Sequence, residues 1–157
     1  MEKLLKIPYA VFNDWDLLQK FLERKGNPRY ELVGNVNLYN RQDIIDLGNL
    51  VRVDGNLGLY YSSIESLGNL EYVGGYFDLN KTPIESLGNL EYVGGDLDLI
   101  YTPIKSLGKL EYVGWILDLR DSPIKSLGNL EYVGKKIWLS INHQIPKEQL
   151  NNFKIKY

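Results

Sequence analysis

A segment of twenty residues recurs along this chain with little change. Residues 84–103 read IESLGNLEYVGGDLDLIYTP, and residues 64–83 and 104–123 repeat the frame as IESLGNLEYVGGYFDLNKTP and IKSLGKLEYVGWILDLRDSP. A unit this short cannot bury its own apolar side chains, so it needs an equivalent unit on each side. The repeat therefore predicts a solenoid, an array of stacked turns that share one elongated core.

The spacing of the apolar residues changes within each unit. Leu97 and Leu99 alternate with other residues, which predicts a short strand with both leucines pointing inward. From Ile84 to Val93 the apolar residues recur every third position and enclose Gly88, which disfavours an α-helix and fits a 3₁₀ or extended segment. We expect about six strands in one parallel sheet, near residues 36–38, 57–59, 77–79, 97–99, 117–119 and 137–139.

The strand and the residues after it resemble the core of a known repeat family. Leu97-x-Leu99-x-x-Thr102-x-Ile104 is similar to the LxLxxNxL core of leucine-rich repeats, in a short version of about twenty residues. The resemblance covers roughly residues 33–142, extends to short-repeat bacterial and phage proteins, and implies a capped leucine-rich-repeat solenoid. The family's asparagine position is held here by Ser62, Thr82, Thr102, Ser122 and Asn142. Hydroxyl groups at this position can still bond the turn backbone.

The segments outside the repeats are expected to close the two ends of a single domain, residues 1–157. In the N-terminal cap, residues 1–32, an apolar stripe from Trp15 to Leu22 follows an N-cap at Asn13, so we expect a helix at 14–25. About six turns follow at 33–142. Residues 143–157 form the C-terminal cap, with a short helix that begins at Pro146.

Cysteine usage and hydropathy bear on the cellular location. The chain has no cysteine, which excludes disulfide-stapled caps and thiolate metal sites and favours the cytoplasm. The first residues lack the apolar core of a signal peptide, and no run approaches about eighteen apolar residues. We therefore expect a cytoplasmic, monomeric protein without a membrane partner.

Three outward-facing columns on the strand face vary from turn to turn while the frame around them does not. Packing dictates the frame, so the variable columns are where a binding surface is expected. The first column is Asn35, Asn56, Tyr76, Asp96, Ile116 and Lys136, the second is Asn37, Gly58, Asp78, Asp98, Asp118 and Trp138, and the third is Tyr39, Tyr60, Asn80, Ile100, Arg120 and Ser140.

The second column contains a row of three carboxylates. Asp78, Asp98 and Asp118 fall on adjacent strands, about 4.8 Å apart, and like charges that face each other destabilise a sheet. An acidic row beside aromatic residues suits a basic protein surface. We predict a partner-binding surface made of Tyr39, Tyr60, Tyr76, Asp78, Asp96, Asp98, Ile100, Asp118, Arg120 and Trp138. Alternatively, the aspartates were copied with the repeat and only keep the surface soluble.

The strand face thus predicts a non-enzymatic protein-binding module, with a protein partner that has a basic surface. Two alternatives stay open. The acidic row could imitate a phosphate backbone, so that the protein inhibits a nucleic-acid-binding enzyme as viral or bacterial antagonists do, or the chain could be a structural or assembly component. Direct nucleic-acid binding is disfavoured, because only the lysines near the C-terminus offer a basic footprint.

Motifs of catalysis and of cofactor or metal binding are missing from the sequence. His143 is the single histidine, and we interpret it as a turn or cap residue. The chain has no nucleophile elbow and no glycine-rich phosphate loop, so we expect neither an enzyme nor a cofactor. A hard cation needs about six converging oxygens, which a flat strand face does not offer, so no metal is expected.

A second ladder lies on the other side of each unit, where EYVG recurs unchanged in four turns. It places Glu71, Glu91, Glu111 and Glu131 beside Tyr72, Tyr92, Tyr112 and Tyr132. A surface tuned to an irregular partner would vary, so the invariance favours a structural role.

Overall fold

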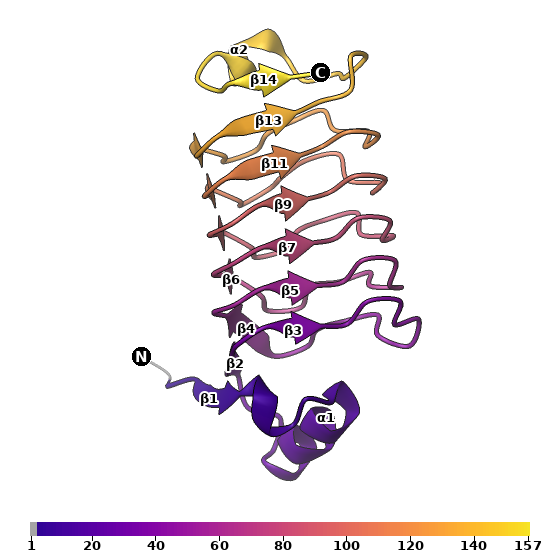
Figure 1. The fold of residues 1–157 in the computed structure, drawn as a ribbon, viewed down its shortest axis with the longest axis vertical. Helices are drawn as coiled ribbons and strands as arrows, with labels where there is room; N and C mark the ends of the chain where they lie inside the picture. Colours follow the sequence, from indigo (N-terminus) through magenta and orange to yellow (C-terminus); the bar gives the residue numbers. More distant parts are fainter. Residues whose placement is uncertain (1–2) are drawn as a thin grey trace.

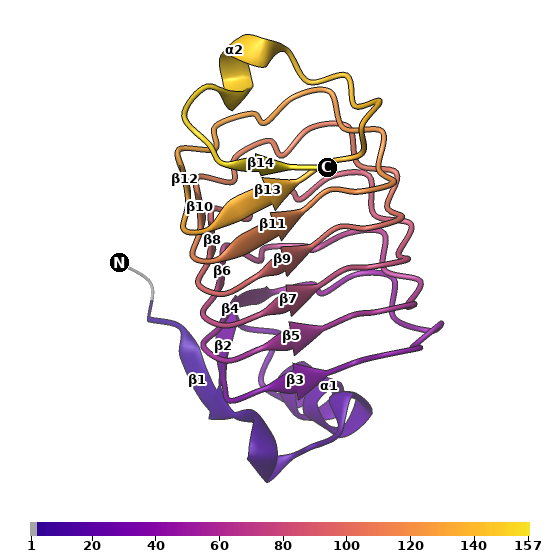
Figure 2. The same cartoon turned by 45° about the horizontal axis from the view of Figure 1, so that its top comes forward.

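The computed structural model describes residues 3–157 and shows a solenoid of parallel strands in two sheets (Figures 1 and 2). Each turn adds one strand to each sheet, and the turns stack along the long axis of the molecule from the N-terminal to the C-terminal end. The predicted solenoid of twenty-residue turns is confirmed.

The front sheet, which faces the viewer in Figure 1, contains the strands that the leucine alternation predicts. The prediction of about six parallel strands on one face is confirmed, and the C-terminal segment adds β14 as a further one. The strands in spatial order are β3 (Val36–Asn37), β5 (Leu57–Gly58), β7 (Phe77–Asp78), β9 (Leu97–Asp98), β11 (Ile116–Asp118), β13 (Lys136–Trp138) and β14 (Ile155–Lys156).

The rear sheet is a second parallel sheet that the sequence analysis did not predict. Of the two forms expected for the arc, 3₁₀ or extended, the structure has the extended form where each arc ends. There the Tyr-Val pair of one turn joins the Tyr-Val pair of the next turn. Within residues 3–157 the only 3₁₀ helix is η1 (Tyr9–Val11), outside the repeats. The strands in spatial order are β1 (Leu5–Pro8), β2 (Tyr30–Val33), β4 (Leu50–Val53), β6 (Tyr72–Val73), β8 (Tyr92–Val93), β10 (Tyr112–Val113) and β12 (Tyr132–Val133).

The core runs the length of the stack between the two sheets and the returning arc. Leu97 and Leu99 are fully buried, as are their equivalents in the neighbouring turns, which confirms their predicted inward orientation. The buried hydroxyls of Thr82 and Thr102 donate to the carbonyls of Leu79 and Leu99, each at 2.7 Å. These bonds satisfy the polar groups that the turn would otherwise bury unpaired.

Glycine occupies the corner between the two sheets because the backbones of successive turns touch there. A Cβ atom on Gly114 would lie 1.9 Å from the carbonyl oxygen of Gly94, and one on Gly94 would lie 2.1 Å from that of Gly74. No side chain fits at such a distance, so this corner requires glycine in the regular turns from Gly74 to Gly134, whereas Asp54 holds the equivalent position of the second turn.

Each end of the stack carries one additional strand, which extends one of the two sheets, and one helix. At the N-terminal end β1 extends the rear sheet, and α1 (Trp15–Arg24) lies beneath β3 in both views (Figures 1 and 2). At the C-terminal end β14 extends the front sheet and α2 (Lys147–Leu150) lies above the last turn (Figure 1). Leu127 N–H donates to Gln149 Oε1 at 2.8 Å, in place of the next turn's carbonyl that Leu107 uses.

The N-terminal helix α1 confirms the predicted range to within one residue at each end, but its N-cap is not Asn13. Asp14 is the N-cap, and its side chain accepts the N–H of Leu17 at 2.9 Å. Asn13 precedes the cap with a φ of 45° and has left-handed backbone geometry instead. The helix buries Trp15 against the first turns, as the apolar stripe predicts.

Candidate partner-binding surface

The carboxylates of the second column have a local structural role that the sequence analysis missed. The side-chain oxygens of Asp78, Asp98 and Asp118 accept the N–H of the residue two positions on, at 3.0, 3.0 and 3.2 Å. Asn37 makes the same bond in the first turn, at 3.0 Å. Aspartate and asparagine favour this arrangement, the Asx turn, because their short side chains reach that N–H. The row therefore shapes the chain's exit from each strand.

The polar residues of the first column link each turn to the next. Asn56 N–H donates to Asn35 Oδ1 and Tyr76 N–H to Asn56 Oδ1, both at 2.8 Å. Asp96 Oδ1 accepts the N–H of Ile116 in the same way, at 2.9 Å. Asp96 thus continues a ladder of side-chain acceptors along the edge of the front sheet.

The acidic row is more buried than a row on an open strand face. Asp78 is only 8% exposed, and burial raises the pKa of its carboxyl. Burial also raises the pKa of Asp98, to about 6. The hydrogen bond from the Ile100 N–H lowers this pKa, and the neighbouring charges of Asp78 and Asp118 raise it further. Asp78 and Asp98 therefore take up protons at higher pH than free carboxylates do.

One member of the row is already paired with a cation. Arg120 Nε donates to Asp118 Oδ1 at 2.9 Å, its Nη2 contacts Oδ2 of the same carboxylate, and its guanidinium lies 5.0 Å from the ring centroid of Trp138. Lys136 approaches the same indole at 5.1 Å. Trp138 is therefore a platform for cations, held at the C-terminal end of the front sheet.

A cavity of about 330 Å³ opens on the front sheet between two aromatic side chains. Five of the predicted partner-binding residues line it, together with Leu97 and Ile116. They are Tyr76, Asp96, Asp98, Asp118 and Trp138. Arg120, Ile100 and Asp78 do not line the cavity. Arg120 lies next to it, because its side chain is hydrogen-bonded to Asp118.

The remaining predicted residues, Tyr39 and Tyr60, lie in the first two turns. Their rings meet edge to face at a centroid distance of 6.2 Å. Tyr39 lies across Gly58, where a Cβ atom would be 2.2 Å from its ring, so this glycine makes room for the aromatic side chain. Both tyrosines therefore form an aromatic group separate from the cavity.

Two exposed tyrosines at the corner after a front-sheet strand are not among the predicted partner-binding residues. Tyr61 and Tyr101 have φ values of 54° and 55°, in the left-handed region, where Asn40 and Asp121 stand in the equivalent positions of other turns. The region suits asparagine and aspartate better than tyrosine. Lys81 has the same conformation with a φ of 57°, so the left-handed corner belongs to the repeat, and Tyr61 and Tyr101 differ from the other turns by their exposed rings directly after the third column.

The tyrosines of the EYVG motif form a continuous stack along the rear sheet. Ring centroids in the column from Tyr72 to Tyr132 are 4.6, 4.6 and 4.7 Å apart with nearly parallel planes. The guanidinium of Arg52 covers the first ring at 3.8 Å. Such a stack requires a tyrosine at the same register position in every turn. This requirement gives a structural reason for the unchanged EYVG motif.

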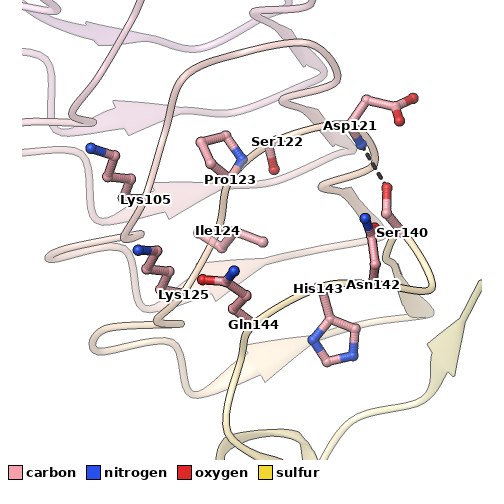
Figure 3. Close-up of a pocket in the computed structure, with 10 residues that line it drawn as sticks. All are labelled: Lys105, Asp121, Ser122, Pro123, Ile124, Lys125, Ser140, Asn142, His143 and Gln144. Carbon is pink, nitrogen blue, oxygen red and sulfur yellow. Dashed lines mark hydrogen bonds between the residues drawn. The ribbon is translucent and has the colours of Figure 1, made fainter.

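A larger hollow of about 540 Å³ lies at the edge of the last turns and includes the single histidine (Figure 3). His143 Nδ1 accepts the N–H of Ile145 at 3.2 Å, and its ring stacks on Tyr157. Ser140 Oγ accepts the N–H of Asp121 at 2.9 Å, the bond drawn in Figure 3. The serine thus links the last turn to the turn before it, while the histidine completes a turn at the start of the C-terminal cap, and no hydrogen bond joins the two side chains among the described residues.

Neither a metal-binding group nor a membrane-spanning helix is found in the described residues. Residues 3–157 contain no group of three histidine or acidic side chains placed to hold a metal, and no helix long and apolar enough to cross a bilayer. No protein-family model, curated protein or solved structure matches this chain. The function is therefore argued from the geometry of the surface itself.

The raised pKa of Asp98 predicts a pH-dependent stability. Its carboxyl has a pKa of about 6 in the folded chain against an ordinary value of 3.8, so the folded state favours the protonated form. Stability is therefore lost as pH rises from about 4 through about 6. Asp98→Asn keeps an acceptor for the Ile100 N–H but cannot ionise. We expect its thermal midpoint to exceed that of the wild type at pH 7 and the advantage to shrink at pH 4; an equal difference at both pH values would contradict the assignment.

Proposed function

We propose that the chain is a non-enzymatic protein-binding module whose front sheet receives a lysine or arginine side chain of a partner protein. The observation that carries the proposal is the arrangement around Arg120, whose guanidinium lies between the Asp118 carboxylate and the Trp138 indole. This geometry combines a bidentate ion pair with a cation–π contact, a combination that guanidinium groups favour.

One turn below, the equivalent carboxylate has no cation, and its neighbour in the next turn is Asp118 in place of an aromatic residue. Asp98 is equivalent to Asp118 in register, but the third-column residue beside it is Ile100 instead of an arginine. Among residues 3–157 no lysine or arginine forms an ion pair with Asp98. A cationic side chain of a partner would enter the cavity and pair with this carboxylate.

Exposed aromatic residues in and directly after the third column offer further contact area outside the cavity. Tyr39, Tyr61 and Tyr101 each expose a large part of their rings. Tyrosine and tryptophan are the residues that most often anchor protein interfaces. The proposed interface therefore combines a charged centre with an aromatic margin.

The alternatives receive less support. A phosphate mimic needs an evenly charged row, whereas Asp78 is buried and Asp118 is neutralised by Arg120. An assembly of stacked chains needs a free edge strand at each end that can pair with the other, whereas the N-terminal edge strand β1 contains Pro8, which has no N–H to donate.

We further infer that the turns are a short variant of the leucine-rich repeat, because the strand and the buried hydroxyl follow the spacing of that family. We also infer that the chain works in the cytoplasm, because it has no cysteine.

The test introduces an arginine into this chain that can pair with Asp98 in place of a partner's basic side chain. Ile100→Arg should place a guanidinium on Asp98 as Arg120 lies on Asp118, and a partner's basic side chain would then be excluded. We expect a protein captured from source-cell lysate by the wild type to be lost by this variant and by Asp98→Asn, with binding that weakens as salt rises.

The matched control is Ile45→Arg, the same exchange at an exposed position of the first turn, outside the front sheet. It should retain the partner. Capture of the same proteins by all four chains would refute the proposed site. Release of the partner by added DNA or RNA would instead favour the nucleic-acid mimic.

A further inference from the structure

The rear sheet stops one strand short of the front sheet at the C-terminal end. β12 pairs with β10 and with no later strand, while β13 of the same turn is covered by β14. As a consequence Tyr132 is 48% exposed and Val133 is partly exposed, whereas Val113 one turn below is fully buried. The core and the tyrosine stack are thus left open at one edge.

Backbone acceptors at this edge lack their donors. In the turn below, Glu111 O accepts the N–H of Glu131 at 2.9 Å and Val113 O accepts the N–H of Gly134 at 3.0 Å. Glu131 O and Val133 O are the equivalent carbonyls of the last turn, and they accept from no strand or turn in the described part of the chain. An edge of this kind is a template for pairing with a further strand.

We propose that β12 is a strand-addition site for an extended segment of another protein that contains the sequence basic–aromatic–aliphatic–glycine. Its backbone N–H groups would bond Glu131 O and Val133 O, which is the strand-addition mode of peptide recognition. Its aromatic ring would continue the stack on Tyr132. Its basic residue would lie beside the exposed Glu131 in register and offset that charge.

The glycine follows from the close approach of successive turns. A Cβ atom on Gly134 would lie only 1.9 Å from the carbonyl oxygen of Gly114. A strand added to β12 at the same spacing meets the carbonyl of Gly134 in the same way, so any residue other than glycine is sterically excluded there.

A second copy of this chain does not provide such a segment. The strand free at its other end is β1, which contains Lys6 and Pro8 but no glycine. Proline has no N–H to donate and protects a sheet edge from pairing. The occupant is therefore a segment of a different protein.

The test uses a peptide that copies one turn of the stack. Residues 89–95 with Glu91→Lys, NLKYVGG, carry the required pattern and can be labelled with a dye at the N-terminus. We expect saturable binding in fluorescence anisotropy. Replacement of the peptide's Gly94 by alanine, or methylation of its Gly94 nitrogen, should each weaken binding by about tenfold or more.

Variants of the full chain separate this site from the front sheet. Tyr132→Ala should weaken peptide binding by about three- to tenfold, because it removes one aromatic contact, and should leave the thermal midpoint close to the wild type. Ile100→Arg should bind the peptide normally. The proposal is overturned if the peptide does not bind, or if the alanine peptide, the N-methyl peptide or Tyr132→Ala binds as well as its parent.

Discussion

Replacing Gly114 by alanine is expected to lower the free energy of unfolding by at least about 4 kcal/mol, a loss that few single substitutions cause. The added Cβ would lie 1.9 Å from the carbonyl oxygen of Gly94 and 2.7 Å from its carbonyl carbon. Both are backbone atoms, so relief requires two turns to move apart and breaks the ladder between them. In a chain of this size the thermal midpoint should fall by about 8–16 °C.

Gly108→Ala is the matched control for this substitution. Gly108 has a φ of 56°, and a Cβ atom there meets nothing within 4 Å. Only the left-handed backbone conformation is penalised, which costs about 1–2 kcal/mol. If the two variants unfold at the same temperature, the close approach of the turns does not limit the choice of residue at the corner.

The second large effect is expected for Phe77→Ala, in the middle of the front sheet. Phe77 is fully buried, and removal of a buried aromatic ring typically costs about 3–5 kcal/mol because the cavity left behind does not close. A solenoid turn contacts only its two neighbours, so few other side chains can move in to fill the space. The urea midpoint, followed by far-ultraviolet circular dichroism, measures the loss.

Phe77→Leu distinguishes this packing cost from a general sensitivity of the position. Leu57 and Leu97 occupy the same register position in the two flanking turns, so the frame already accommodates leucine. We expect a loss of about 1 kcal/mol. A loss as large as that of the alanine variant would mean that the turns are not interchangeable.

The front sheet and the N-terminal helix were predictable because a single local pattern determines each of them. The alternation around Leu97 indicates a strand without reference to any other segment, and the stripe from Trp15 to Leu22 indicates a helix. The N-cap was misplaced by one residue because Asn13 and Asp14 both have capping side chains. Only the backbone conformation separates them.

The rear sheet escaped the sequence analysis because its strands in the regular repeats, β6, β8, β10 and β12, are only a Tyr-Val pair each and exist through pairing with the neighbouring turns. The apolar period of three between Ile84 and Val93 is the same in an unpaired extended segment. The signal that was available is the glycine that follows each Tyr-Val pair, since it permits the backbone contact. β1 and β14 lie outside the repeat, so the repeat period does not predict them.

The candidate surface was predicted in part. Column positions followed from strand alternation, which is why Tyr76, Asp98 and Trp138 do line one cavity. The burial of Asp78 depends on side chains from neighbouring turns and could not be read from the chain. The Asx turns could have been found, because aspartate at a strand end commonly accepts the N–H two residues on.

The tyrosine column gives this protein an optical reporter of its own. Rings 4.6–4.7 Å apart and nearly parallel are coupled electronically, so the near-ultraviolet dichroism of the column depends on adjacent turns staying in register. Of the three tryptophans, Trp15 emits from the first cap, whereas Trp115 and Trp138 emit from the last turns at the opposite end of the array. The native chain therefore allows fraying from either end to be distinguished from all-or-none melting without an introduced label.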